Sequence, residues 1–184
     1  AVKLMESDMM RRFTMALQST NQDVLKNIKR VNLKEEAMTK VAETAFANDM
    51  SVNTELIIGL PGETWESWTQ GLCDLLSRDI IVEAYPVTIL QNSEMNEPGY
   101  KEKHGITQVT LKSYFSNIVD EYQETLTGTK DLPEEQMKKL WLWTWYTSMM
   151  DANGFTQIVT RYLNKRHGMQ FEKFYERLLD WGLE

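Results

Sequence analysis

Cysteine is nearly absent from this chain, because Cys73 is the only one among 184 residues. A single thiol excludes an intramolecular disulfide, and it excludes any site in this chain that needs three or four thiolate ligands. No apolar run approaches the roughly eighteen residues of a membrane-spanning helix, and no N-terminal stretch has the basic-then-apolar layout of a signal peptide. These absences favour a cytoplasmic protein without a membrane partner.

Clustered positive charge is also missing. The 20 Lys and Arg residues are scattered and are outnumbered by 27 Asp and Glu, which gives a formal net charge of -7. Because non-specific nucleic-acid binding depends on clustered Lys and Arg that displace counterions, the sequence argues against a nucleic-acid partner. With 42% hydrophobic residues and six Trp, the chain can bury the core of one domain with a helical appendage.

Three short apolar segments alternating with helical patterns predict a parallel sheet. Strands are expected over residues 13–19, 52–59 and 80–90. Between them, helices are expected over residues 23–30, capped by Asn21 or Asp23, over residues 33–46, and along the apolar stripe of Trp68, Leu72, Leu75 and Leu76. Alternating strands and helices are typical of right-handed βαβ units, so the predicted fold class is α/β.

The remainder of the chain has a different pattern. Residues 91–105 are polar and aperiodic and contain Pro98-Gly99, which predicts a long loop or lid. Helices are expected over residues 110–125, 134–151, 155–167 and 171–183, with no further strand. We therefore divide the chain into an α/β part, residues 1–106, and a helical domain, residues 107–184.

Polar residues lie at the expected carboxyl ends of the strands, where parallel sheets bind ligands. Gln18 and Ser19 follow the first strand, and the Gln18 amide suits ribose hydroxyls or a carboxylate. The alternative is that both residues only end the strand and cap the next helix. Gly59 opens a Gly-Leu-Pro-Gly turn whose backbone can approach a flat ligand, or which is simply a structural turn.

For several charged and aromatic residues, too, the sequence allows either a functional or a structural interpretation. Glu55 interrupts an apolar strand, so it is either a functional carboxylate or half of a structural ion pair. Arg30 either reaches a substrate carboxylate or lies solvated at a helix C-terminus. Residues 141–146, Trp-Leu-Trp-Thr-Trp-Tyr, are interpreted as a packing hub with an exposed member at an interface, and not as a stacking platform. Cys73 is interpreted as an inert buried thiol, and His104 and His167 as helix-end residues outside any metal site.

Three landmarks in order resemble a known superfamily. They are Ala-Leu-Gln-Ser at residues 16–19, Asp-Val-Leu-Lys-Asn-Ile-Lys-Arg at 23–30, and Glu-Leu-Ile-Ile-Gly-Leu-Pro-Gly-Glu-Thr at 55–64. Together they resemble the radical S-adenosylmethionine superfamily, and in particular its cobalamin-binding-domain type, the anaerobic magnesium-protoporphyrin cyclase-like group. The resemblance implies a partial (β/α) barrel of about three parallel strands, followed by a helical bundle.

The resemblance also implies which residues contact S-adenosylmethionine. Gln18, Arg30 and Glu55 match polar contacts of the oxygen-independent coproporphyrinogen dehydrogenases, although Glu55 stands where aspartate is common. Ile57 and Gly59 would lie beside the adenine, and Thr88 would line the same pocket. The predicted cofactor-binding residues are Gln18, Ser19, Arg30, Glu55, Ile57, Gly59 and Thr88. No catalytic or metal-binding residue is predicted.

The superfamily's cysteine-triad loop, its Gly-Gly-Glu strand and any cobalamin domain would all precede residue 1. The resemblance therefore implies a C-terminal fragment of an iron-sulfur oxidoreductase or methyltransferase-type enzyme, inactive alone, that supplies the nucleoside- and substrate-facing side of the cavity. A 4Fe-4S cluster, and cobalamin, would be bound elsewhere in the parent enzyme. Expected partners are a small-molecule substrate, the missing cluster domain, and a second copy paired through the sheet edge near Phe13.

Two other functions stay open from the sequence. The first is a cluster-free binding or scaffold module derived from the same superfamily. The second is an unrelated barrel enzyme that binds a nucleotide at residues 59–64, which predicts affinity for phosphates and not for a sulfonium nucleoside.

Overall fold

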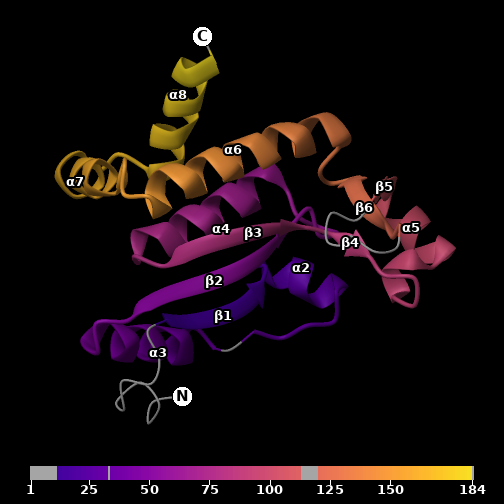
Figure 1. Cartoon of the computed structure of the whole chain (residues 1–184), viewed down its shortest axis with the longest axis horizontal. Coiled ribbons are helices and arrows are strands. Elements are labelled where there is room, and N and C mark those ends of the chain that lie inside the picture. The colour runs from indigo at the N-terminus through magenta and orange to yellow at the C-terminus, as the bar shows by residue number, and fades with distance from the viewer. Residues whose placement is uncertain (1–11, 33, 113–119, 184) are drawn as a thin grey trace.

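The computed structural model of the chain describes residues 12–32, 34–112 and 120–183. These residues form a mixed α/β structure, in which a three-stranded parallel sheet precedes a three-stranded antiparallel sheet and a C-terminal helical region. Figure 1 shows the parallel sheet at the centre, the antiparallel strands beyond one end of it, and the last helices above it. The predicted α/β class with a helical C-terminal region is therefore confirmed.

The parallel sheet has a simple winding. It contains β1 (Arg12–Gln18), β2 (Ser51–Ile58) and β3 (Ile81–Pro86) in the spatial order β1-β2-β3. Both neighbouring pairs are parallel. Because each strand lies beside the preceding one, the chain winds in one direction, as it does in a (β/α) barrel and within one half of a doubly wound sheet. All three strands overlap the segments predicted from the sequence.

The crossover helices begin where local capping signals place them. α2 (Gln22–Asn27) and α3 (Glu35–Ala47) connect β1 to β2, and α4 (Trp65–Ser77) connects β2 to β3. The Asn21 side chain caps α2 by accepting from the amides of Asp23 and Val24. Thr64 and Ser67 form a capping box at the start of α4. The predicted apolar stripe of α4 is buried.

Alternating strand residues distinguish two faces of the parallel sheet. Met15, Leu17 and Leu56 are buried in one core with residues of α3 and α4, whereas Thr14 and Ala16 are exposed. We call the side that no helix of the described residues covers the open face. It carries Arg12, Thr14 and Ala16 of β1, Asn53, Glu55 and Ile57 of β2, and Ile81, Glu83 and Tyr85 of β3.

The second half of the chain begins with short elements and ends with long helices. β4 (Thr88–Ile89), β6 (Tyr122–Gly128) and β5 (Thr107–Lys112) form the antiparallel sheet in that spatial order. A 3-10 helix, η1 (Glu94–Asn96), and α5 (Pro98–His104) lie between β4 and β5 in sequence. α6 (Glu134–Ala152), α7 (Gln157–His167) and α8 (Phe171–Leu183) follow, as predicted. No helix of the described ranges is both long and apolar enough to cross a bilayer.

Three predictions for this half are wrong. Residues 80–90 do not form one strand, because β3 ends at Pro86, which has no N–H to donate, and Thr88 pairs with Thr125 in the other sheet. Residues 91–105 are not one long loop, because they contain η1 and α5, with Pro98 in its first turn and Gly105 as its left-handed C-cap. Residues 110–125 do not form a helix, because β5 and β6 pair there; the intervening residues 113–119 lie outside the described part.

The C-terminal helices pack against α4 through a few specific contacts. The indole N–H of Trp68 donates to Thr144 Oγ1 of α6 at 2.8 Å. Trp143 is buried while Trp145 is 59% exposed, as expected for a packing hub with an exposed member. Arg161 of α7 donates to Asp151 Oδ1 of α6 and to the Leu76 carbonyl oxygen of α4, each at 2.6 Å. These contacts fix α6 and α7 on the helix-covered side of the sheet.

Candidate functional site

The carboxyl ends of the parallel strands bring two of the predicted residues to one edge of the sheet. Gln18 ends β1 with φ 67°, a left-handed conformation that is uncommon for a residue with a side chain. Gly59 follows β2 with φ 86°. A Cβ on Gly59 would meet the flexible end of the Met137 side chain of α6, which would have to shift, and the positive φ is what favours glycine here. The Gly59 turn therefore has a structural function whether or not it also contacts a ligand.

Ser19 is turned toward the start of α4. It is 1% exposed, and its hydroxyl donates to Glu63 Oε2 at 2.9 Å. The hydroxyl of Ser67 donates to the other oxygen of the same carboxylate. Burial raises the pKa of Glu63, while the two hydroxyl donors act in the opposite direction by stabilising the charged form. Ser19 thus joins β1 to the start of α4, a contact that the sequence did not predict, while the cap of the following helix α2 is Asn21.

Sequence reasoning missed Glu63, although it lies within the motif that carried the resemblance. The Gly-Glu-Thr triplet indicates a turn before a helix, and an acid there is ordinarily solvated. Its burial depends on Ser19, which lies 44 residues earlier in the chain. No local pattern could have identified that contact.

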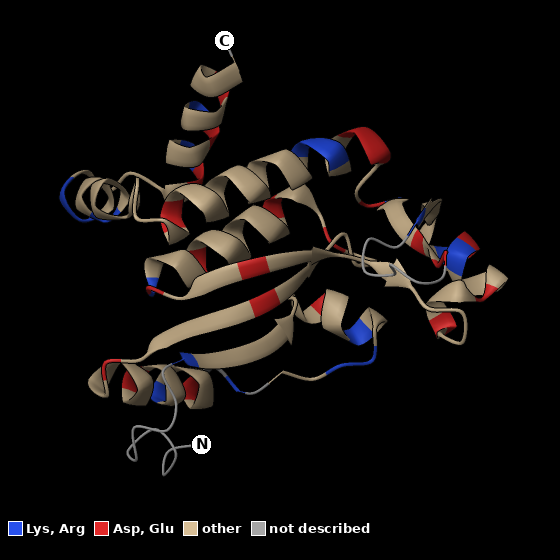
Figure 2. Cartoon of the chain, in the orientation of Figure 1, with Lys and Arg blue, Asp and Glu red and all other residues tan. Residues whose placement is uncertain are grey.

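The open face carries a polar cluster in the middle of the strands. Glu55 of β2 lies directly opposite Glu83 of β3 in the sheet register. The acidic bands on these two neighbouring strands lie side by side in Figure 2. Glu83 accepts hydrogen bonds from Asn53 Nδ2 at 3.0 Å and from the Tyr85 hydroxyl at 2.8 Å. The hydrogen bond to Glu83 is the main reason why the pKa of Tyr85 is raised.

Asn53, Glu83 and Tyr85 were also missed in the sequence. Their signal was the strand period: Asn53 and Glu55 are two residues apart, as are Glu83 and Tyr85, so each pair projects from the same face of its strand. Ile57 has the same parity and is partly buried on that face. Of the predicted cofactor-binding residues, Glu55 and Ile57 therefore lie together on the open face.

Arg30 and Thr88 lie apart from this cluster. Arg30 is exposed after α2, and its side chain makes no hydrogen bond or ion pair with any described residue. Thr88 is exposed in β4, where it pairs with Thr125. The structure thus brings Gln18, Gly59, Glu55 and Ile57 to one edge and one face of the parallel sheet.

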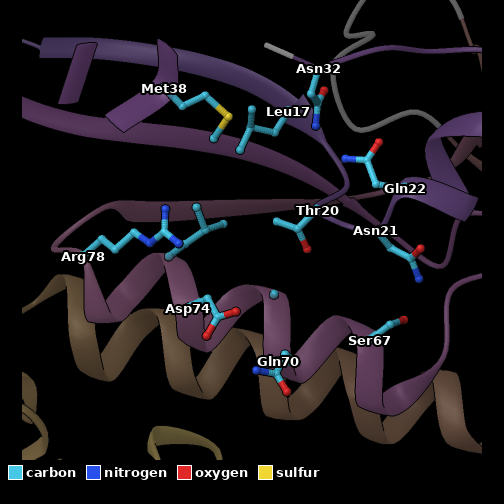
Figure 3. Close-up of a pocket in the computed structure, with 12 residues that line it drawn as sticks. Leu17, Thr20, Asn21, Gln22, Asn32, Met38, Ser67, Gln70, Asp74 and Arg78 are labelled. Carbon is cyan, nitrogen blue, oxygen red and sulfur yellow. The ribbon is translucent and has the colours of Figure 1, made fainter. Parts of the chain in front are cut away.

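A separate cavity of about 400 Å³ lies on the helix-covered side. Figure 3 shows it between β1, α3 and α4, with Leu17 and Met38 on one side and Gln70, Asp74 and Arg78 along α4 on the other. Its lining includes none of the predicted cofactor-binding residues. The cavity is thus separate from the open face and its polar cluster.

The donor groups of the described residues do not fit an iron-sulfur cluster. Cys73 is buried in α4, and burial, with nearby acids, raises the pKa of its thiol. The described part of the chain contains no group of three or more His, Cys, Asp or Glu that could hold a metal ion. S-adenosylmethionine is different, because the Gln18 amide, the Glu55 carboxylate and the backbone edge at Gly59 are suited to hydroxyls and a base. These residues fit one wall of a nucleoside site.

The N-terminus of α4 does not suit a phosphate. Two of the amides at this end are occupied by the capping box, since Ser67 N–H donates to Thr64 Oγ1 at 3.1 Å and Thr64 N–H donates to Ser67 Oγ at 3.0 Å. The carboxylate of Glu63 lies next to the same turn. An anion would compete with the capping box and lie near the Glu63 carboxylate, which argues against the nucleotide-binding alternative at residues 59–64.

Comparison of the sequence with known proteins supports a relationship between this chain and the radical S-adenosylmethionine superfamily. No protein-family model matches the chain. The chain is 28% identical, over 96% of its length, to the cobalamin-dependent radical SAM methyltransferase TokK of Streptomyces tokunonensis. It is 28% identical, over 94% of its length, to 2-(S-pantetheinyl)-carbapenam-3-carboxylate methyltransferase of Streptantibioticus cattleyicolor. It spans only 27% and 26% of these two relatives.

Proposed function

We propose that this chain is part of a cobalamin-dependent radical S-adenosylmethionine methyltransferase, and that its open sheet face and the edge at Gln18 and Gly59 form the nucleoside- and substrate-facing wall of the cavity. The observation that carries the proposal is the contrast between a helix-covered face and a polar open face on the same three strands. Similarity to two methyltransferases supports methyl transfer as the reaction. The more specific cyclase-like assignment stays a prediction.

The chain's own residues would bind and orient the nucleoside. S-adenosylmethionine, when bound, would supply the methyl group for the reaction. The Gln18 side chain can donate to and accept from ribose hydroxyls, and the Glu55 carboxylate can accept from them. Ile57 offers an apolar contact beside these groups, and Gly59 adds no side chain of its own, although the end of the Met137 side chain packs against it. Any cluster and cobalamin would be held by polypeptide outside the described residues.

The proposal also concerns the edges of the sheet. β1 and β3 are the two edge strands, so one side of each has no strand partner among the described residues. Further polypeptide of the same enzyme, or a second copy, would pair there and complete the barrel. A monodisperse monomer in solution scattering would count against pairing with a second copy.

Calorimetric titration of the chain with S-adenosylhomocysteine tests the nucleoside assignment. We expect saturable binding that weakens about tenfold in Gln18→Ala and in Glu55→Ala, since each loses a hydrogen bond to the ligand. Gln70→Ala, in the cavity on the other side of the sheet, is the matched control and should bind normally. Unchanged binding in both Gln18→Ala and Glu55→Ala would contradict the proposal. A folded chain that binds no nucleoside would favour the scaffold alternative.

A further inference from the structure

The two carboxylates in the middle of the open face form an unfavourable pair. Glu55 and Glu83 are direct partners in the register of β2 and β3, and such partners have Cβ atoms about 5 Å apart. Like charges at this separation destabilise a sheet. The Arg12 guanidinium is 3.6 Å from Glu83 Oε1, but its side chain is 61% exposed at the rim of the face. Glu55 has no hydrogen bond or ion pair with any described residue.

The position of Glu83 is fixed by its neighbours. Oε1 accepts from Asn53 Nδ2 and Oε2 accepts from the Tyr85 hydroxyl. Both oxygens keep a further lone pair that can accept another donor. The carboxylate is therefore oriented for an additional hydrogen bond without moving.

A second, independent observation comes from Asn53. The residue is 1% exposed, and its Oδ1 has no hydrogen-bond partner among the described residues. Its amide orientation is set because Nδ2 donates to Glu83. A buried acceptor without a donor is costly, so Oδ1 indicates a donor that belongs at this position.

We propose that Glu55, Glu83 and Asn53 form a binding site for a primary ammonium group, supplied by a small-molecule amine or by a lysine side chain of polypeptide that covers the open face. An ammonium carries three N–H donors and one positive charge, which matches one carboxylate from each strand and the orphaned amide oxygen. Its charge also relieves the repulsion between Glu55 and Glu83. The site lies in the middle of the strands and shares only Glu55 with the proposed nucleoside wall.

An NMR titration of the 184-residue chain tests the ammonium site. The side-chain amide of Asn53 is followed as n-butylammonium or methylammonium chloride is added at constant ionic strength. We expect a saturable shift with both, and none with tetramethylammonium, which carries the charge without an N–H. Glu83→Gln should weaken the affinity about tenfold, because one charged acceptor is lost. Glu43→Gln, on exposed α3 surface, is the matched control and should bind normally.

The two probes distinguish the sources of the ammonium group. Tighter binding of n-butylammonium than of methylammonium supports a lysine side chain, whose aliphatic stem would lie on the sheet. Equal binding supports a small-molecule amine. An equal response to tetramethylammonium, the absence of a saturable shift, or unchanged affinity in Glu83→Gln would overturn the proposal.

The nucleoside proposal fails or succeeds separately. Adenosine, which unlike S-adenosylhomocysteine carries no ammonium group, separates the two sites: Gln18→Ala should keep its ammonium affinity while losing adenosine, and Glu83→Gln should show the reverse. Ammonium affinity lost equally in both variants would overturn the ammonium site as a separate feature.

Discussion

The two faces of the parallel sheet have opposite chemistry, although they belong to the same three strands. The covered face carries Met15, Leu17 and Leu56, each at most 5% exposed, against apolar residues of α3 and α4. The open face carries Glu55, Glu83 and the side-chain amide of Asn53. The hydrogen bonds on this face join neighbouring polar side chains. Burial of apolar area on the covered face stabilises the fold, whereas the open face holds the groups that can recognise a ligand.

The largest expected effect comes from two neighbours in β2. Leu56 is 1% exposed on the covered face, and Ile57 is only partly buried on the open one. Leu56→Ala should lower the free energy of unfolding by about 4 kcal/mol, because it removes transfer energy and leaves a cavity. Ile57→Ala should cost less than about half as much. Urea unfolding of both variants measures the difference, and equal costs would show that the open face is also packed.

The next effect concerns the helices that lie over the covered side. Asp151 is 3% exposed and pairs with Arg161, which also pairs with Asp79, whose side chain is 62% exposed. Asp151→Asn should cost about 3 kcal/mol, since it leaves a partly buried guanidinium without its main counterion. Asp79→Asn, which removes the exposed partner of the same arginine, should cost less than about 1 kcal/mol. A reversed order in thermal unfolding would mean that α7 is held mainly at its exposed contact.

A third prediction concerns Gly59, at the border between the two faces. Gly59→Ala should cost about 2 kcal/mol, because alanine is strained at φ 86° and its Cβ collides with Met137. A double-mutant cycle with Met137→Ala separates the two causes. We expect Gly59→Ala to cost about 1 kcal/mol less in the Met137→Ala background than in the unsubstituted chain, and this difference measures the collision alone. A coupling of zero would assign the entire cost to the backbone.

The sequence predicted the parallel sheet because its signals are local. Apolar strands, Asn21 as a cap and the Pro-Gly turn after β2 each depend on a few neighbouring residues. The segment of β5 and β6 was predicted as a helix although Val109 and Leu111 alternate with polar residues, because this period of two is short and was overlooked. Pairing with β6 determines its conformation.

The candidate site was predictable only in part. Gln18, Glu55 and Gly59 could be placed from strand ends and from the resemblance. The contact between Ser19 and Glu63, and the register that sets Glu55 opposite Glu83, depend on segments far apart in the chain. Helix α5 was missed although its signals were present, because Pro98 and Gly105 were interpreted as loop residues instead of as the two ends of a short helix.

The smallest expected effect is a pH dependence at the junction of the two faces, where Glu63 joins Ser19 to α4. Burial raises the folded-state pKa of Glu63 above its ordinary value of 4.5. Its contribution to stability is therefore fully present below about pH 4.5 and is lost as the pH rises through the folded-state pKa. Glu63→Gln keeps a polar partner for Ser19 and Ser67 but cannot ionise, so the unfolding free energy of this variant should fall less over this pH range.

Urea unfolding between about pH 4 and about pH 8 measures this difference, with Glu66→Gln, at an exposed acid of the same helix, as control. Parallel curves for Glu63→Gln and the unsubstituted chain would mean that the hydroxyl donors offset the burial of the carboxylate, and that Glu63 is a charged tie between β1 and α4.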